Sequence, residues 1–458
     1  MTCMFSKPNI LFLIVDSFRA DKFFGKDRTC KTPNIDNLVK NGAYFQQAIS
    51  TSDATILNWA TIFSGLFPPK TGVRSEQFNK VNDNIETIFD VLQENNYNFY
   101  SYLTNISEIL GLFPEFQNKD SFEFSEPRLN DGVGNRIIKN IGSGKLKEPW
   151  LFIIHSMDLH FPIILPDEYS TSEFGQSTYE KQISSIDSWI GKISDTIDSE
   201  KTLFVITADH GSYINSVNID GKIISTEENY SNETLKRKIG FKIPKFLDPV
   251  KKRAFFHTEK KSQENRLKKI ENFDLKPHQK RNLLSGKFEI NHTLFDDKVR
   301  IPLLFYGKNI KSEKIIEQQV RNADIFPTLL DLIELKNSLK LDGVSLKPLM
   351  EDKIFGELPA YIESTPLIQI ESNDVVGVRT EKYKYFRDSD DSQKRIHLYD
   401  LKTDPYEDSN VHENNPKIIL EMEQILSSFT KRIDASNDEF SEEETEMIED
   451  ELRKMGYV

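Results

Sequence analysis

The sequence predicts an α/β fold with a mostly parallel sheet flanked by helices. Short apolar runs alternate along the chain with amphipathic stretches, which is the pattern of a parallel sheet covered by helices on its faces. The runs are four to eight residues long, the length of buried strands. We expect strands over 9–15, 97–103, 150–154, 202–207 and 301–305.

Helices are expected between these strands, over 35–41, 85–94, 179–197 and 325–333. Residues 212–288 interrupt the alternation and are rich in Lys, Arg, Asn and Glu. We interpret this stretch as an insertion, part helix and part mobile loop. One interpretation is a cationic lid that steers an anionic substrate. The other is a solvated helical segment on the surface, because runs of charged residues usually lie on the surface.

The pattern changes after residue 341. Short extended pieces at 360–363, 375–379, 383–387 and 395–399 precede a helical stretch at 416–429. This order predicts a small antiparallel sheet with a packed helix. The expected organisation is a large α/β domain over 1–340, with the insertion at 212–288, and a C-terminal α+β subdomain over 341–458.

Composition excludes some classes of protein. The net charge of -13 over 458 residues argues against a nucleic-acid-binding protein, which needs basic surface. The two cysteines form no CxxC motif, which fits a reducing compartment. No apolar run reaches the length of a membrane span, and the run at 9–15 lacks a signal peptide's flanks. We therefore expect a cytoplasmic protein without a membrane span.

Acidic and imidazole side chains follow the apolar runs. Asp16 and Asp209 each come just past a predicted strand, as does His155, and His210 with Gly211 follows Asp209. Ligand sites of open α/β sheets lie beyond the carboxyl ends of strands. Carboxylates and an imidazole are suitable ligands for Zn, Mn, Mg or Ca, although buried Asp–His pairs are often structural.

Thr55 precedes a predicted short helix at 56–64, which Gly65 closes as a C-cap. There its hydroxyl would meet free backbone N–H groups and the positive end of the helix dipole. One interpretation is ordinary N-capping by Thr55 or its neighbours. The other is a nucleophile, because a coordinated metal lowers the pKa of a hydroxyl and activates it.

Further motifs are spread along nearly the whole chain, interrupted by the insertion. They lie at 8–11 with 15–21, 32–38, 42–45, 64–68 with 72–73, 208–211, 294–297 with 299–303, 324–329, 342–346, and 398–401 with 404–407. Together they resemble the sulfatase family of the alkaline phosphatase superfamily. The resemblance implies an alkaline-phosphatase-like fold. It also implies a divalent metal held by Asp16, Thr55, Asp209 and His210, with Thr55 as the nucleophile.

The resemblance implies three further catalytic residues. His160 resembles a histidine that binds substrate oxygens, and His292 resembles the late active-site histidine of the family. Asn58, three residues after Thr55, resembles the oxyanion-holding asparagine of nucleotide pyrophosphatase and phosphodiesterase relatives. One metal ion is expected; a second one at His160 and His292 is the alternative.

The sequence also departs from the sulfatase pattern. Sulfatases oxidise a Cys or Ser to formylglycine, with a Pro and an Arg two and four residues later, but here the three positions are Thr55, Leu57 and Trp59. Oxidation of a secondary alcohol gives a ketone, so Thr55 cannot become an aldehyde. Ser17 follows Asp16 where sulfatases often have a second Asp.

These observations predict a metal-dependent hydrolase or transferase that acts on phosphate monoesters, diesters or phosphonates through Thr55. One alternative is a sulfuric ester hydrolase that works without formylglycine. Another is a non-catalytic sulfatase-like binding protein, which Trp59 in place of a charged residue keeps open. The expected partner is an anionic ester of a small molecule, a glycan or a lipid head group; the oligomeric state is left open.

Overall fold

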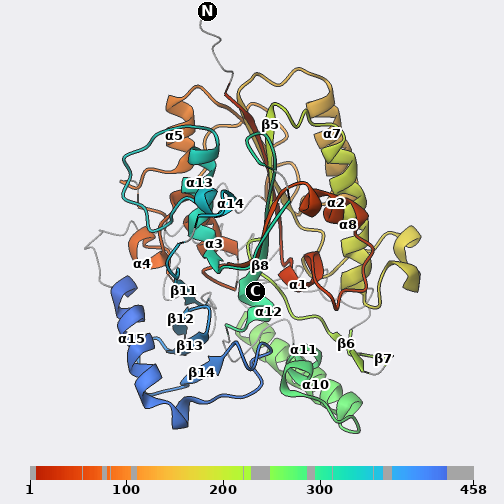
Figure 1. Cartoon of the computed structure of the whole chain (residues 1–458). Helices are drawn as coiled ribbons and strands as arrows, with labels where there is room; N and C mark the ends of the chain where they lie inside the picture. The colour runs from red at the N-terminus through yellow and green to blue at the C-terminus, as the bar shows by residue number, and fades with distance from the viewer. Residues whose placement is uncertain are drawn as a thin grey trace, which may run out of the picture.

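The structure is a computed structural model built around one large twisted sheet (Figure 1). It describes residues 7–53, 55–74, 80–82, 84–104, 111–219, 221–227, 248–285, 294–311, 313–353, 355–364 and 374–430. The strand order is β10-β2-β8-β5-β1-β4-β3, and β9 pairs with β2. All neighbours pair in parallel except that β8 runs antiparallel to both β5 and β2. The predicted mostly parallel sheet is therefore confirmed.

The predicted strands are all present in this sheet. They are β1 (Asn9–Val15), β3 (Asn98–Tyr102), β4 (Trp150–Ser156), β5 (Thr202–Thr207) and β8 (Arg300–Gly307). Sequence analysis missed β2 (Ala43–Ile49), β9 (Lys314–Ile316) and β10 (Val320–Arg321). The apolar run of β2 is broken by Gln46 and Gln47, at the place where its register with β8 shifts, so its pattern is not that of a buried strand.

Helices cover both faces of the sheet (Figure 1). One face carries α3 (Thr55–Ser64), α5 (Ile88–Glu94) and α13 (Ile325–Leu332), and the other α2 (Pro33–Lys40), α7 (Gly134–Gly142) and α8 (Thr178–Ser194). Local signals set their starts: Ser177 caps α8 by accepting from the Glu180 N–H, and Thr87 forms a capping box with Asp90 at α5.

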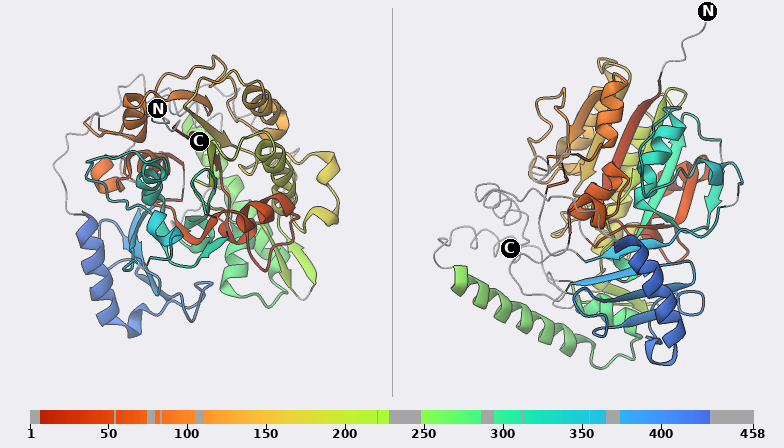
Figure 2. Two further views of the ribbon diagram at one scale, coloured as in Figure 1. Left: turned by 45° about the horizontal axis from the view of Figure 1, so that its top comes forward. Right: turned by 90° about the vertical axis from the view of Figure 1, so that its left-hand side faces the viewer.

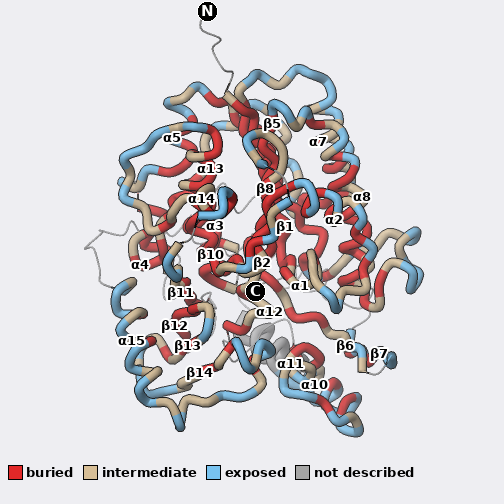
Figure 3. Tube along the Cα trace, viewed as in Figure 1, coloured by how far each residue is buried: buried red, intermediate tan, exposed pale blue. Residues whose placement is uncertain are grey.

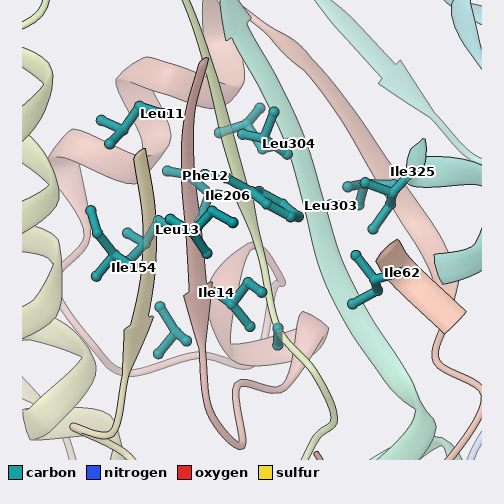
Figure 4. Close-up of a cluster of buried hydrophobic side chains, with 14 of the residues drawn as sticks. Leu11, Phe12, Leu13, Ile14, Ile62, Ile154, Ile206, Leu303, Leu304 and Ile325 are labelled. Atoms are coloured by element: carbon teal, nitrogen blue, oxygen red, sulfur yellow. The ribbon is translucent and has the colours of Figure 1, made fainter. Parts of the chain in front are cut away.

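The core lies between the sheet and these helices (Figure 3). Every residue of β1, β4 and β5 is buried, as expected for parallel strands covered on both faces. Figure 4 shows Leu11 and Leu13 on one side of β1 and Ile14 on the other, with Ile62 of α3 beside Ile325 of α13. Among the described residues, no helix is long and apolar enough to cross a membrane.

The structure describes residues 212–219, 221–227 and 248–285 of the predicted insertion. It contains the hairpin β6 (Ser216–Ile219) and β7 (Lys222–Ser225), followed by α10 (Asp248–Ile270) and α11 (Pro277–Leu284). Ile224, Ile270 and Leu283 join in a small hydrophobic cluster of their own. Figure 2 shows α10 as a long helix at the lower side of the molecule. Its Lys260 and Lys261 are exposed; the role of a cationic lid stays a prediction.

The C-terminal part forms the predicted antiparallel sheet. Its strands are β11 (Ala360–Glu363), β12 (Val375–Arg379), β13 (Tyr383–Asp388) and β14 (His397–Asp400), in that order, with α15 (Pro416–Thr430) packed on them. The domain boundary expected at residue 340 stays a prediction.

A buried ion network joins this sheet to the segment before β8. Asp296 begins the short helix α12 (Asp296–Val299) and contacts Arg379 at 2.8 Å and Lys384 at 2.5 Å. Lys384 is fully buried and also contacts Glu407 at 2.8 Å. Buried charges of this kind are tolerated because each has an opposite partner. The network therefore couples the C-terminal sheet to the strand edge at which β8 begins.

His397 should make the C-terminal sheet sensitive to acid. Its ring stacks on Phe386 with centroids 4.5 Å apart; burial lowers the pKa of His397 to about 4, and His412 and Arg395 act in the same direction. The unfolded chain takes up this proton near pH 6.5. Stability should therefore fall as the pH drops from about 6.5 to 4, by up to about 3 kcal/mol.

Urea denaturation at several pH values between 4 and 7 measures this effect. His397→Gln should flatten the dependence of the unfolding free energy on pH in that window. His257→Gln, which removes an exposed histidine, is the matched control and should leave the slope unchanged. Equal slopes for wild type and His397→Gln would show that His397 does not cause the acid sensitivity.

Candidate active site and metal centre

The candidate site lies at the carboxyl edge of three neighbouring strands. β1 pairs in parallel with β4 on one side and with β5 on the other. Asp16 follows β1, His155 is the second-last residue of β4, and Asp209 lies two residues past β5. Because parallel strands end at the same edge of a sheet, the topology brings these three side chains together. All three are buried.

The two carboxylates are oriented by hydrogen bonds from the Ser17 and His210 segments. Asp16 Oδ1 accepts from Ser17 Oγ at 2.6 Å. Asp209 Oδ1 accepts from the backbone N–H of His210 at 2.8 Å and of Ser17 at 3.3 Å. Ser17 has a φ of 61°, an uncommon left-handed conformation for a serine. The backbone between Asp16 and Phe18 is therefore bent so that it serves both carboxylates.

Thr55 reaches these carboxylates from the start of α3. Its Oγ1 donates to Asp209 Oδ2 at 2.7 Å and lies 3.4 Å from Asp16 Oδ2. The hydroxyl thus lies at the N-terminus of a helix and also contacts both carboxylates, which is more than N-capping requires. The structure brings together Asp16, Thr55 and Asp209 as the sequence predicts.

The loop before Thr55 is held by buried polar contacts. Ser52 N donates to Asn58 Oδ1 at 3.1 Å, and Asn58 Nδ2 donates back to Ser52 O at 2.8 Å. Asn322 Nδ2 donates to Asn58 Oδ1 at 2.9 Å and Asn322 Oδ1 accepts from Thr51 Oγ1 at 2.8 Å. Asn58 is fully buried. In this structure it orders the Thr55 loop, while its predicted contact with a substrate oxyanion stays a prediction.

The side chain of Lys298 lies beside the same loop. Lys298 of α12 contacts Asp53 at 3.2 Å, two residues before Thr55, and its ammonium lies over the Tyr213 ring. The pairing offsets the negative charge of Asp53, which would otherwise repel an anionic substrate from the hydroxyl. Sequence analysis did not select Lys298, which falls between the two motif segments at 294–297 and 299–303.

His210 completes a group of three potential metal ligands. Ligand atoms of Asp16, Asp209 and His210 all lie within 4.8 Å of one another, and all three residues are buried. His210 Nδ1 lies 2.7 Å from Gly211 O, a carbonyl that can only accept, so Nδ1 donates to it and Nε2 is the nitrogen left to bind an ion. Within the described residues, Nε2 has no hydrogen-bond partner. It lies 3.8 Å from Asp209 Oδ2.

Gly211 is required by the close packing behind His210. A Cβ at this position would come within 2.3 Å of the Asp297 carbonyl oxygen. Its N–H donates to Lys298 O at 2.6 Å. The close approach of these two backbones fixes the loop that carries Asp209 and His210 against α12.

The electrostatics suit a bound cation. Burial opposes ionisation of Asp209, but His210 and His155 outweigh it and hold the pKa of Asp209 well below its usual value. Burial also opposes a charge on His210, yet Asp209 and Asp16 raise its pKa. Two carboxylates, an imidazole lone pair and a hydroxyl that face one point are a donor set that fits a divalent ion.

The structure says less about the two remaining predicted site residues, His160 and His292. His160 is buried in the loop after β4, where its backbone N–H donates to Met157 O at 3.1 Å. The contact of its imidazole with substrate stays a prediction. Asp158 anchors that loop, accepting from Ser156 Oγ at 2.6 Å and Leu129 N at 2.7 Å. His292 lies outside the described residues.

A family model confirms the assignment that the motifs suggested. The model described as "Sulfatase" matches residues 8–335, which is more than half of the chain. The chain belongs to the sulfatase family. A second model, described as the C-terminal part of N-sulphoglucosamine sulphohydrolase, matches residues 286–438.

Sulfatases are also its curated relatives. Arylsulfatase K of Gallus gallus is 22% identical over 473 residues, which covers 92% of this chain and 82% of the relative. The delta 4,5-hexuronate-2-O-sulfatase of Bacteroides thetaiotaomicron is 22% identical and covers 93% and 89%. This chain therefore belongs to a family of enzymes, and these two relatives are sulfatases.

Solved structures show the same fold. A putative sulfatase from Bacteroides thetaiotaomicron superposes with a TM-score of 0.64 at 17% identity, covering 95% of each chain. The phosphonate monoester hydrolase of Agrobacterium radiobacter superposes with a TM-score of 0.63 at 15% identity, covering 92% of this chain and 95% of that one. Proteins of this fold thus include both sulfur and phosphorus ester hydrolases.

Proposed function

We propose that this sulfatase-family protein is a metal-dependent hydrolase or transferase of phosphate esters, either monoesters, diesters or phosphonates. The observation that supports it most is Thr55 itself. Its hydroxyl lies 2.7 Å from Asp209 and 3.4 Å from Asp16 at the start of α3, which is the position of a nucleophile. As a secondary alcohol it cannot form the aldehyde on which ordinary sulfatase chemistry depends.

Asp16, Thr55, Asp209 and His210 would hold the divalent ion. When bound, such an ion supplies positive charge that lowers the pKa of the hydroxyl and offsets negative charge in the transition state. Asp209 Oδ2 is proposed to take the hydroxyl proton, and the hydrogen bond that Thr55 Oγ1 donates to it supports this role. The structure thus supports an activated threonine oxygen.

The proposed reaction has two displacements. Thr55 Oγ1 attacks phosphorus in line with the leaving oxygen; the new O–P bond forms, the bond to the leaving group breaks, and the departing oxygen takes up a proton. Water or an acceptor alcohol then attacks the phosphothreonine and releases Thr55. His160 and His292 are proposed to donate to the equatorial oxygens. Asn58 contributes by holding the Thr55 loop.

Sulfate-ester hydrolysis is the second candidate, favoured by the names of the relatives. A threonine sulfate lacks the elimination route of a formylglycine hydrate, so water would have to attack the sulfur directly and break its bond to the threonine oxygen. We place this reaction second because Thr55 is a secondary alcohol and cannot form an aldehyde.

A panel of four p-nitrophenyl esters tests the choice. Phosphate monoester, phosphodiester, phosphonate monoester and sulfate share one leaving group, so differences in kcat/KM report the transferred group. At least one phosphorus ester should exceed the sulfate by about 10³-fold. Faster turnover of the sulfate would overturn the proposal in favour of the second candidate. A metal-loaded protein that turns over none of the four would support the non-catalytic alternative.

A further inference from the structure

The second oxygens of the two site carboxylates face one point. Asp16 Oδ1 and Asp209 Oδ1 accept hydrogen bonds from the Ser17 and His210 segments. Asp16 Oδ2 and Asp209 Oδ2 instead both face the Thr55 hydroxyl. Each carboxylate thus keeps one oxygen for the protein and turns the other into the site, which defines where a cation would lie.

His155 approaches the same point from β4. Its Nε2 lies 3.5 Å from Asp209 Oδ2 and 3.8 Å from Asp16 Oδ2. The side chain is 1% exposed. Within the part of the chain that the structure describes, neither of its ring nitrogens has a hydrogen-bond partner. A buried polar group normally finds a partner, because leaving it unpaired costs roughly 1–3 kcal/mol. An imidazole in this state indicates a ligand.

Trp59 sets the direction of the His155 ring. The two rings meet edge to face, with centroids 4.7 Å apart and planes at 83°. Trp59 is fully buried in α3, one turn after Thr55. The same helix therefore delivers the hydroxyl and holds the imidazole with Nε2 toward the carboxylates. Packing, rather than a second hydrogen bond, orients this ring.

The separations fit ligands of a single ion. Two ligands of a metal at bond lengths of about 2.1 Å lie roughly 3.0 to 4.2 Å apart, depending on the angle between them. Four of the separations fall in this range: Thr55 to Asp16 at 3.4 Å, His155 to Asp209 and Asp16 at 3.5 and 3.8 Å, and His210 to Asp209 at 3.8 Å. The fifth, Thr55 to Asp209 at 2.7 Å, is shorter because these two atoms share a hydrogen bond. Hydrogen bonding alone would draw His155 Nε2 closer to one carboxylate.

We propose that His155 is a further ligand of the metal ion. The donors would then be two imidazole nitrogens with carboxylate and hydroxyl oxygens. Imidazoles favour Zn²⁺ and similar transition ions, whereas Ca²⁺ and Mg²⁺ prefer all-oxygen sites. The site therefore selects a zinc-like ion over Ca²⁺ and Mg²⁺. This inference rests on the metal centre of the proposed function.

The test counts histidine ligands on the full chain. Protein stripped with a chelator is reloaded with Zn²⁺, and X-ray absorption measures the number of imidazoles per ion. The wild type should show at least two and should bind Zn²⁺ at least about 100-fold more tightly than Ca²⁺. His155→Gln should lose one imidazole and about 100-fold in Zn²⁺ affinity, with little change for Ca²⁺. An unchanged imidazole count in His155→Gln would overturn the proposal.

Two further variants separate the outcomes. His257→Gln removes an exposed histidine and should match the wild type in both measurements. Asp209→Asn tests the metal centre itself: if it keeps its zinc, the proposed function fails together with the inference. If Asp209→Asn loses zinc while His155→Gln keeps its imidazole count, only the role of His155 fails. If His155→Gln does not fold, the wild type alone still decides, because a count of one imidazole per zinc ion would refute the role of His155.

Discussion

Replacing Thr55 with alanine is expected to lower kcat for the best p-nitrophenyl phosphorus ester by about 10⁴-fold or more, as removal of a nucleophile typically does. The alanine has no oxygen to attack phosphorus, and Asp209 loses the proton donor 2.7 Å away. Initial rates and active-site titration measure this effect. Activity equal to the wild type would remove Thr55 from the mechanism.

The Thr55→Ala variant should fold and bind metal as the wild type does. Alanine is a good helix former, and the buried Trp59, Ile62 and Phe63 continue to anchor α3. Elemental analysis should therefore find the metal still bound by Asp16, Asp209 and His210. Thr55→Ser is the matched control, since it keeps a hydroxyl at the same place and should retain measurable turnover.

Replacing Asp209 with asparagine is expected to deplete the metal to less than about a tenth of the wild-type content and to abolish turnover. Asp209 Oδ2 is the atom that Thr55, His155 and His210 all approach. The neutral amide of asparagine has an oxygen that binds metal ions more weakly than a carboxylate oxygen, and it carries no negative charge. Elemental analysis of protein purified in parallel measures the metal.

Asp187→Asn provides the control for this experiment. Asp187 is also a buried carboxylate, but it accepts from the backbone N–H of Ile35 at 2.7 Å and so links α8 to α2. The variant should lose stability and keep its metal. Wild-type metal occupancy in Asp209→Asn would show that the carboxylate cluster is not the metal centre.

Much of this site follows from periodicity and local chemistry. The apolar runs of β1, β4 and β5 are uninterrupted, and a polar residue ends each run, so Asp16 and Asp209 were predictable as strand-end groups. The C-terminal strands and α15 follow equally from short runs and their turn residues. The helix at Thr55 was readable because Gly65, with a φ of 67°, closes it as expected.

Asn58 and His155 were harder to interpret. The sequence shows Asn58 one turn after Thr55, but only the fold places Ser52 and Asn322 against its amide. His155 follows a strand as Asp16 does, yet the sequence does not state that β4 lies next to β1 and β1 next to β5. Contacts between side chains from different strands depend on that order.

The sequence by itself determined the fold class, the family and the hydroxyl of Thr55, because these depend on local patterns and on the residues present. The tertiary structure decided which of the candidate groups meet. It turned the second oxygens of Asp16 and Asp209 toward Thr55 and brought His155 to them from a neighbouring strand. Strand order and side-chain direction are long-range properties, set by the packing of the whole core and not by any one segment.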